Sequence, residues 1–306
     1  MKNLDGRISN FDQVASLRRY TLTEGKGVGL DVIDCDNGKL RFLLNVTKGL
    51  DVMQLYHKGE NVSFLSKNAF SARETDFLSR FEGGMLYTCG LDSVGGREGY
   101  PLHGTYHNMT AEVTRTECNE DGITVEAIIR STALFGRNLV MYRRVSTAVG
   151  GDTFSIEDRL VNRGFGDENY CLLYHVNVGY PMLDDGATIE ADVLENTARS
   201  SWSEQHKATF LQMESPVPCK EETCYFLKLA EPKVSLTNKK NGKRFTLAYS
   251  GDTLPAFIEW KSMASADYAL GLEPATTYLD DKFVYKTLAP EEEVSFALRF
   301  TVTEID

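Results

Sequence analysis

Three short segments of the chain each place a proton-handling side chain inside an apolar or strand-like stretch. They supply two imidazoles, His103 and His175, and one carboxylate, Glu273. Histidine and glutamate can both be tuned towards neutral pH, so that one group removes a proton while another delivers one. The set therefore predicts proton-transfer chemistry without a metal or another cofactor. Opening of a sugar ring at its anomeric carbon is such a reaction.

His175 lies in segment 170–178, which has the pattern of a β-strand. Side chains alternate between the two faces of a strand, so His175 and Asn177 share one face, while the aromatic and aliphatic residues between them form the other. We expect the apolar face to pack in the core and the other face to present an imidazole and an amide. The alternative is a buried His175 and Asn177 that satisfy each other's hydrogen bonds.

Glu273 ends a second strand-like segment, 267–273. It shares a face with Ala269 and Gly271, two small residues that leave space above the sheet. A carboxylate beside such an open floor can approach a ligand closely. The alternative is an exposed strand end whose carboxylate accepts a hydrogen bond from a backbone amide.

Other residues near these segments are candidates for contact with a substrate. His103 precedes Gly104, and glycine allows a tight turn in which the backbone approaches a ligand. Trp260 and Lys261 offer a stacking ring and a hydrogen-bond donor, although a core tryptophan beside a surface lysine is the alternative. We predict His103, Asn177 and Lys261 as substrate-binding residues.

The overall composition excludes several classes of partner. With 33 Lys and Arg against 44 Asp and Glu, the formal net charge is −11, which offers no excess of cations for nucleic acid or an anionic membrane. The first residues lack the apolar core of a signal peptide, and no apolar run approaches membrane-spanning length. Six cysteines spread over 306 residues are typical of reduced thiols. We expect a cytoplasmic protein whose partner is a small-molecule sugar.

Alternating hydrophobicity and turn residues dominate the chain, which is typical of many antiparallel strands. The clearest predicted strands are 41–46, 123–129, 139–145, 154–160 and 294–300. Glycine-containing turn signals lie at 36–38, 120–122, 150–152, 184–186 and 241–242. Only short stretches, such as 11–19, are candidate helices, and no linker or repeat divides the chain. The sequence predicts an all-β protein, a large antiparallel β-sandwich that forms a single domain over residues 1–306.

Five motifs, taken in their order and spacing, resemble those of a known family. They are Lys48–Val52, Leu86–Leu91, Pro101–Gly104, Leu173–Pro181 and Gly271–Pro274. On these residues the chain resembles the aldose 1-epimerase (galactose mutarotase-like) superfamily, and within it a branch described as a domain of unknown function. The resemblance covers almost the whole chain and implies a large β-supersandwich with a concave sugar-binding face.

The resemblance also implies roles for the three proton-handling residues. In mutarotases a carboxylate takes the proton of the anomeric hydroxyl, a histidine protonates the ring oxygen, and the opened sugar recloses on either face. By similarity Glu273 is the base, His175 the acid and His103 a substrate-contacting histidine, in an isomerase that interconverts the anomers of an aldose. These roles require the three side chains to converge at one concave pocket, with the imidazole and the carboxylate across a gap the size of a sugar ring. They also require an ionised carboxylate and a protonated imidazole. Their mutual attraction favours that state, whereas burial opposes it.

Two positions depart from the pattern of this branch. Lys48 stands where the branch usually has Arg, and Thr105 stands where Arg usually follows the His-Gly motif. The arginine that other mutarotases place ahead of His-Gly has no counterpart at a motif position, although Arg80 and Arg97 are nearby. These departures concern recognition of the sugar hydroxyls and leave the proton-transfer pair intact.

Other classes of function fit parts of the sequence. A metal-dependent sugar isomerase would use His103, His107 and Glu112, because a strand would place both histidines on one face and these ligands suit several divalent metals. That reading leaves His175 and Glu273 without a role. A carbohydrate-binding domain without catalysis would share the sandwich, since a fold does not fix a function. A glycosidase ordinarily needs two suitably spaced carboxylates, and the motifs place only one.

Overall fold

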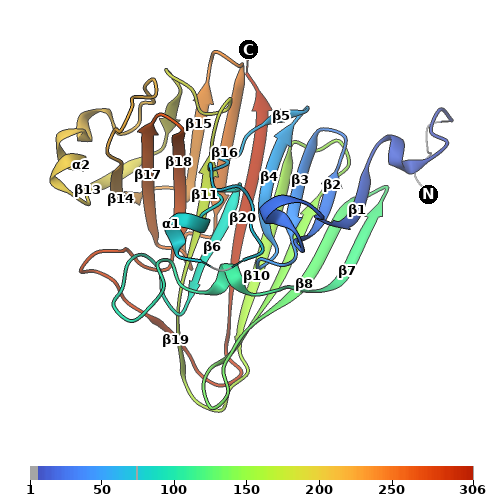
Figure 1. Ribbon diagram of the computed structural model, residues 1–306, viewed down its shortest axis with the longest axis horizontal. Helices are drawn as coiled ribbons and strands as arrows, with labels where there is room; N and C mark the ends of the chain where they lie inside the picture. The colour runs from blue at the N-terminus through green and yellow to red at the C-terminus, as the bar shows by residue number, and fades with distance from the viewer. Residues whose placement is uncertain (1–5, 74, 306) are drawn as a thin grey trace.

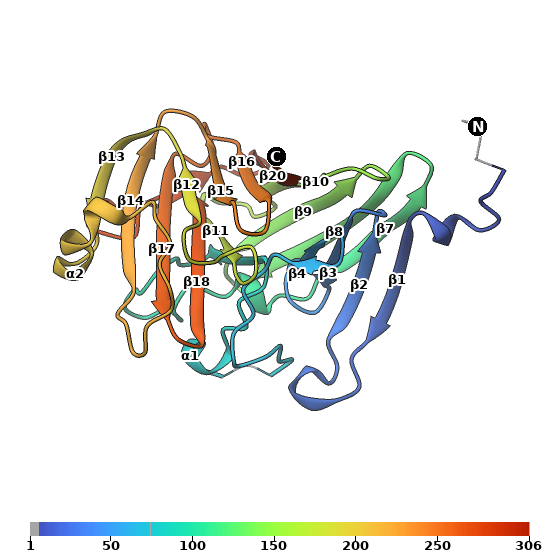
Figure 2. The ribbon, with the colours of Figure 1, turned by 90° about the horizontal axis from the view of Figure 1, so that it is seen from above.

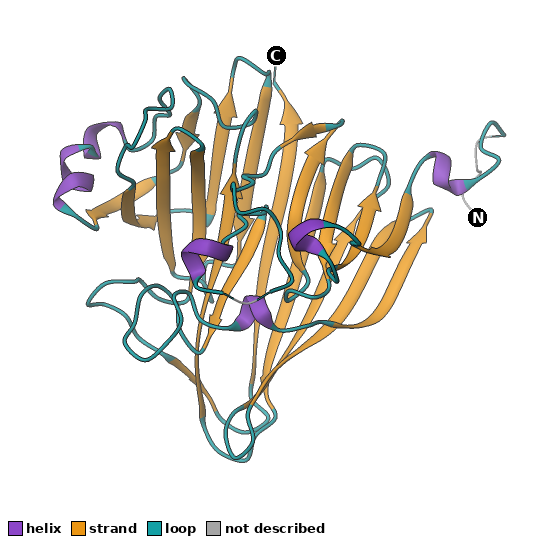
Figure 3. Ribbon diagram, viewed as in Figure 1, coloured by secondary structure: helices purple, strands orange, loops and turns teal. Residues whose placement is uncertain are grey.

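The computed structural model describes residues 6–73 and 75–305, and most of its regular structure is β-strand (Figure 1, Figure 3). Its strands form three sheets, in which neighbouring strands run antiparallel. The predicted all-β, antiparallel sandwich is therefore confirmed.

The first sheet is a meander of five strands near the N-terminus, in sequence order. Its strands are β1 (Ser16–Thr21), β2 (Asp31–Asp36), β3 (Leu40–Asn45), β4 (Asp51–His57) and β5 (Glu60–Asn61). Figure 2 shows β1 to β4 facing β7 to β10 of the second sheet as two layers. Buried apolar side chains from both layers form one continuous core.

The second sheet has eight strands in the order β12-β15-β16-β20-β10-β9-β8-β7. They are β12 (Thr188–Glu190), β15 (Lys233–Asn238), β16 (Lys243–Tyr249), β20 (Glu293–Glu304), β10 (Thr153–Asn162), β9 (Asn138–Thr147), β8 (Gly122–Thr132) and β7 (Glu112–Asn119). The five strands predicted most clearly from the sequence match β3, β8, β9, β10 and β20 to within a few residues.

The third sheet carries the segments of His175 and Glu273. Its order is β13-β14-β17-β18-β11-β19, and β6 also pairs with β11. The strands are β13 (Val193–Ala198), β14 (Thr223–Leu229), β17 (Ala256–Ala264), β18 (Asp267–Ala275), β11 (Glu168–Val178), β19 (Lys286–Leu288) and β6 (Leu86–Leu91).

Helices in the described residues are short. They are the α-helices α1 (Phe77–Arg80) and α2 (Ser201–Gln205) and the 3-10 helices Phe11–Gln13, Gly25–Gly27, Tyr106–Asn108 and Lys207–Thr209. Neither α-helix is long enough to cross a membrane, since the longer of the two, α2, has five residues.

The helix predicted over residues 11–19 is wrong beyond its first turn. Asn10 and Gln13 cap each other across the 3-10 helix Phe11–Gln13, which ends at Val14. Residues from Ser16 onwards instead form β1, because pairing with β2 satisfies their backbone groups. Pairing of β1 with β2 therefore outweighs the weak helical pattern of residues 11–19.

Strand β11 separates two apolar environments, as its alternation predicts. Tyr174 and Val176 point into the main core between the sheets. Cys171 and Leu173 belong to a second, smaller cluster on the other face. His175 and Asn177 share that second face, so the fold turns the imidazole away from the main core.

A cluster of charged side chains lies buried within the main core, beneath the third sheet. Arg143 is fully buried and binds both carboxylate oxygens of Asp158, at 2.9 and 2.7 Å, and one oxygen of Asp51 at 2.8 Å. Tyr174 donates to Asp158 at 2.7 Å. We call these four residues the Arg143 cluster. Every carboxylate in it has a hydrogen-bonded partner, which offsets the cost of burying the charges.

Candidate active site

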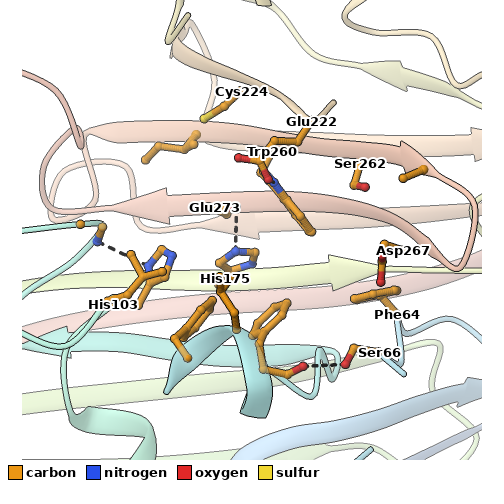
Figure 4. A pocket seen from close by; sticks show the side chains of 18 of the residues that line it. Phe64, Ser66, His103, His175, Glu222, Cys224, Trp260, Ser262, Asp267 and Glu273 are labelled. Carbon is orange, nitrogen blue, oxygen red and sulfur yellow. Dashed lines mark hydrogen bonds and ion pairs between the residues drawn. The ribbon is translucent and has the colours of Figure 1, made fainter. Parts of the chain in front are cut away.

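A cavity of about 580 Å³ opens over the outer face of the third sheet (Figure 4). His103, His175 and Glu273 all line it, although 72 and 98 positions separate them in the chain (175 − 103 and 273 − 175). The convergence that the sequence predicts is therefore present. Strands β11, β17 and β18 supply the floor, and the loops around Phe64 to Phe81 and Gly95 to His103 supply one wall.

His175 and Glu273 form the centre of the site. Nε2 of His175 lies 3.2 Å from Oε1 of Glu273, and the two residues are only 5 % and 2 % exposed. Strands β11 and β18 are neighbours, and their register pairs Val176 with Leu272, which places the two side chains next to each other on one face. The contact is an ion-pair distance rather than an aligned hydrogen bond, since Oε1 of Glu273 has no hydrogen-bond partner among the described residues.

This contact is closer than the sequence analysis expects. A sugar ring was expected to fit between the two groups, whereas the structure leaves no such gap. Direct contact still suits the reaction, because the anomeric hydroxyl and the ring oxygen are bonded to the same carbon atom. Two adjacent protein groups can therefore reach both oxygens from one side of the sugar.

Burial controls the protonation of the pair. It raises the pKa of Glu273 well above its ordinary value, and the charge of Arg199 opposes this only in part. Burial also lowers the pKa of His175 far below its ordinary value, and the neighbouring His103 adds to the effect. Both shifts favour the neutral forms, a carboxylic acid beside an unprotonated imidazole.

Gly271 leaves the space that the Glu273 side chain occupies. A methyl group at position 271 would collide with Oε1 of Glu273 and would press against Trp260. The carboxylate therefore lies back over the glycine, towards the middle of the cavity floor. The lack of a side chain at position 271 therefore allows the carboxylate of Glu273 to adopt this position.

His103 occupies a strained turn at one end of the cavity. Its φ is +65°, and Gly104 continues the left-handed turn at +75°. Nδ1 of His103 accepts a hydrogen bond from the backbone N–H of Gly95 at 3.4 Å, which leaves Nε2 to carry the proton. Burial, together with the charge of Arg199, lowers the pKa of His103 to about 4. His103 is thus a neutral donor, and its ring lies 5.6 Å from the ring of His175.

Asn177 does not line the cavity. It is fully buried beside His175, and its amide donates to the backbone carbonyl of His175 at 2.9 Å. Its oxygen and Nδ1 of His175 are both buried without a hydrogen-bond partner among the described residues. Its bond to the His175 backbone favours a role in holding this strand rather than in touching a sugar.

Lys261 also lies away from the cavity, on the opposite face of β17 from Trp260. Its ammonium group donates to the backbone carbonyls of Thr209, Phe210 and Gln212, at 3.2, 2.7 and 3.1 Å. The prediction of Lys261 as a substrate-binding residue is therefore not supported by its position, because strand alternation turns adjacent side chains to opposite faces. Trp260 is the member of this pair that lines the cavity.

We expect Lys261→Met to destabilise the fold by about 2–4 kcal/mol, because three carbonyls lose a charged donor. Burial raises the pKa of the neighbouring Glu259 to about 8, so this carboxyl stays neutral at pH 7 and adds no unpaired charge. Urea unfolding measures the effect. Lys228→Met, which removes an exposed lysine paired with Glu195, is the control and should cost less than about 1 kcal/mol. Equal effects of the two variants would contradict an anchoring role for Lys261.

The structure separates the residues of the metal-dependent alternative. His103 lines the cavity, but His107 lies in a 3-10 helix, where Asp51 and Glu82 bind its two ring nitrogens at 2.8 and 3.0 Å. Glu112 is on β7 and forms an exposed ion pair with Arg130. The strand that would place the two histidines on one face is not formed. Across residues 6–73 and 75–305, no cluster of three or more His, Cys, Asp or Glu side chains is arranged to hold a metal.

Arg199 and Glu222 are cavity residues that the sequence analysis missed. They form an ion pair at the mouth of the cavity, and Glu222 also accepts a hydrogen bond of 2.6 Å from Nε1 of Trp260. A guanidinium donates and a carboxylate accepts, so the pair can bind neighbouring sugar hydroxyls. Neither Arg80 nor Arg97 lines the cavity. Of the three residues, the sequence indicated only Trp260. Arg199 and Glu222 lie just outside strands and belong to no motif.

Comparison with solved structures identifies the fold. The chain is similar to a protein from Klebsiella pneumoniae subsp. pneumoniae MGH 78578 named a "putative aldose 1-epimerase", with a TM-score of 0.87 and 20% identity over 97% of this chain and 87% of that chain. It is also similar to a galactose mutarotase-like protein from Clostridium acetobutylicum, with a TM-score of 0.71 and 14% identity over 96% of this chain and 100% of that chain. Identities this low show the fold alone.

Comparison by sequence places the chain in a family. No curated protein sequence matches it significantly. The family model described as "Domain of unknown function (DUF4432)" matches residues 27–302. The chain therefore belongs to the DUF4432 family and has a galactose mutarotase-like β-sandwich fold.

Proposed function

We propose that this protein is a sugar mutarotase, an isomerase that interconverts the anomers of an aldose by opening and reclosing its ring. The observation that carries the proposal is the buried contact of 3.2 Å between Nε2 of His175 and Oε1 of Glu273 on the floor of a cavity. Such a pair can exchange protons with two oxygens on one carbon atom. The names of the structural relatives support the same class of reaction.

In the proposed mechanism Glu273 takes the proton of the anomeric hydroxyl and His175 protonates the ring oxygen. Burial favours the neutral pair, in which the carboxyl holds the proton. Moving that proton from Oε1 to Nε2 across the contact gives the carboxylate and the imidazolium without any exchange with solvent. Hydrogen bonds from sugar hydroxyls stabilise the carboxylate and thus favour the charged form when substrate binds. The two groups titrate as a coupled pair, so their pKa values describe the pair rather than either residue alone.

The remaining cavity residues bind and orient the sugar in this mechanism. Trp260 supplies an aromatic wall, and its ring lies 5.5 Å from that of His175. Arg199 and Glu222 supply a donor and an acceptor for the hydroxyls, while His103 donates from Nε2 at the other end. Fixed donors of this kind lower the entropic cost of reaching the reactive geometry.

Saturation-transfer NMR on a panel of aldoses tests the function. The two anomers of each sugar give separate signals, and the protein should accelerate their exchange for at least one sugar. A protein that binds sugar while the anomers exchange at the uncatalysed rate would be a carbohydrate-binding domain instead. That outcome would overturn the proposed mutarotase activity.

The pH profile of the activity should follow the pair rather than a free histidine. The active form holds one proton between the two groups. It gains a second proton only below the lowered pKa of His175 and loses its proton only above the raised pKa of Glu273. We therefore expect kcat/KM to show no inflection near pH 6.5, about the ordinary value for histidine, and to fall only below the lowered pKa of His175 and above the raised pKa of Glu273. Loss of activity through an inflection near that value would contradict these protonation states.

A further inference from the structure

The cavity continues beyond the catalytic pair as a groove along strands β17 and β18. Its floor consists of facing pairs in register: Ile258 with Glu273, Trp260 with Gly271, Ser262 with Ala269, and Ala264 with Asp267. Glu273 and Asp267 are six positions apart, which corresponds to about 20 Å at about 3.3 Å per residue. Both residues line the cavity. A pyranose ring with its hydroxyls, built from bonds of about 1.5 Å, spans roughly 6 Å, so the groove exceeds one sugar.

The part of the groove beyond Trp260 is open because its floor carries small side chains. Ser262 and Ala269 form one pair, and Ala264 forms the next with Asp267. Figure 4 shows Ser262 and Asp267 on the side of Trp260 away from His103. The opposite end of the cavity is apolar around His103, where Phe77, Leu102 and Leu279 line it. A longer ligand that presents polar groups therefore fits towards Asp267.

Ser262 offers a polar contact in this part of the groove. The residue is 6 % exposed and lines the cavity, yet its hydroxyl forms no hydrogen bond with any other described residue. A cavity-lining hydroxyl without a protein partner is available to donate to a ligand and to accept from it. A ligand hydroxyl above Ser262 would supply that partner.

The charges along the groove favour a neutral ligand. Among the described residues that line the cavity, each cation has a carboxylate partner: Lys67 with Asp267 at 2.7 Å, Arg199 with Glu222, and Lys220 with Glu214 at 2.5 Å. A phosphate or carboxylate group would have to compete with these partners. Hydroxyl groups both donate and accept hydrogen bonds, so they can bind to these ion pairs without separating the charged partners.

We propose that the substrate is a neutral oligosaccharide of at least two residues. Its reducing end lies on His175 and Glu273, and its next sugar lies over Ser262 and Ala269 towards Asp267. This inference rests on the proposed anomer exchange for the placement of the reducing end. It adds a second sugar subsite, which monosaccharide exchange does not require.

The test compares sugars that share a reducing end. Saturation-transfer NMR gives kcat/KM for glucose, maltose, cellobiose, lactose and melibiose, together with glucose 6-phosphate and galacturonate as anionic probes. At least one disaccharide should exceed both glucose and the anionic sugars by about tenfold or more, the equivalent of one or two additional hydrogen bonds. Ser262→Phe should remove this preference. Ser262→Ala, which only deletes the hydroxyl, should lower the preference about fivefold.

Ser295→Phe is the matched control, because Ser295 is exposed on β20 of the second sheet, away from the cavity. It should leave the ratio of disaccharide to monosaccharide activity unchanged. Exchange of glucose without any preference for a disaccharide, or preference for an anionic sugar, would overturn the second subsite and leave the mutarotase activity intact.

If no sugar exchanges, ligand-observed NMR of disaccharide binding separates the two proposals. Binding of a disaccharide that Ser262→Phe abolishes would support the subsite while the mutarotase activity fails. Absence of binding by every disaccharide would overturn the subsite as well.

Discussion

Glu273→Gln should lower the rate of anomer exchange by about 10²- to 10⁴-fold, the usual contribution of a general acid or base. The amide keeps the shape of the side chain above Gly271 and still forms hydrogen bonds, but it cannot accept the proton of the anomeric hydroxyl. Sugar binding should therefore remain, so the loss should fall on kcat more than on KM. Saturation-transfer NMR with the best aldose measures both.

Glu259→Gln is the matched control for this variant. Glu259 is a buried glutamate on the adjacent strand β17, but its side chain faces away from the cavity, next to Lys261. Activity should be unchanged in this control. Near wild-type turnover in Glu273→Gln, or equal losses in the two variants, would contradict the role of Glu273 as the base.

The same substitution should also change how stability depends on pH. The pKa of Glu273 is raised in the folded protein above its value in the unfolded chain. Its favourable contribution is therefore complete below the unfolded pKa and is lost as the pH rises through the folded pKa. Glutamine does not ionise, so Glu273→Gln should lose less stability than the wild type on going to alkaline pH. Thermal melts across this range measure the difference.

Arg143→Met should be the most destabilising single substitution considered for this fold, by about 3–5 kcal/mol. Arg143 is fully buried and pairs with Asp51 and Asp158, so its removal leaves Asp158 without a cation and Asp51 with His107 as its remaining partner. Denaturant unfolding followed by fluorescence measures the loss. A variant that fails to accumulate as folded protein would agree with the same expectation.

Arg130→Met is the comparison for this effect. Arg130 lies on the neighbouring strand β8, but it is half exposed and its pair with Glu112 is at the surface. Its removal should cost less than about 1 kcal/mol. Unfolding midpoints that coincide for Arg143→Met and Arg130→Met would contradict a structural role for the Arg143 cluster.

Much of the fold was predictable because alternation and turn chemistry are local signals. The hairpin turn at 36–38 and the strands β8, β9 and β10 follow from such patterns. The common face of His175 and Asn177 followed from alternation alone, and so did the space above Gly271, which the side chain of Glu273 itself fills. Convergence of these side chains came from the family resemblance, since no local pattern specifies which strands become neighbours.

The parts of the site that escaped prediction depend on contacts between distant segments. Glu222 contacts both Arg199 and Trp260, and these residues come from just outside the ends of β13 and β14 and from β17. The spacing of the three residues in the sequence does not indicate that they are in contact. Lys261 was assigned to the substrate because it is adjacent to Trp260, although adjacency in a strand means opposite faces. The direct contact between His175 and Glu273 depends on the register of two strands, which the sequence does not specify.

The most direct test of the central claim is anomer exchange by saturation-transfer NMR with the wild type, Glu273→Gln and His175→Gln side by side. If His175 and Glu273 form the proton-transfer pair, the wild type accelerates exchange of at least one reducing sugar, and both variants lose that acceleration while still folding. Acceleration by the wild type that survives in either variant would contradict the claim.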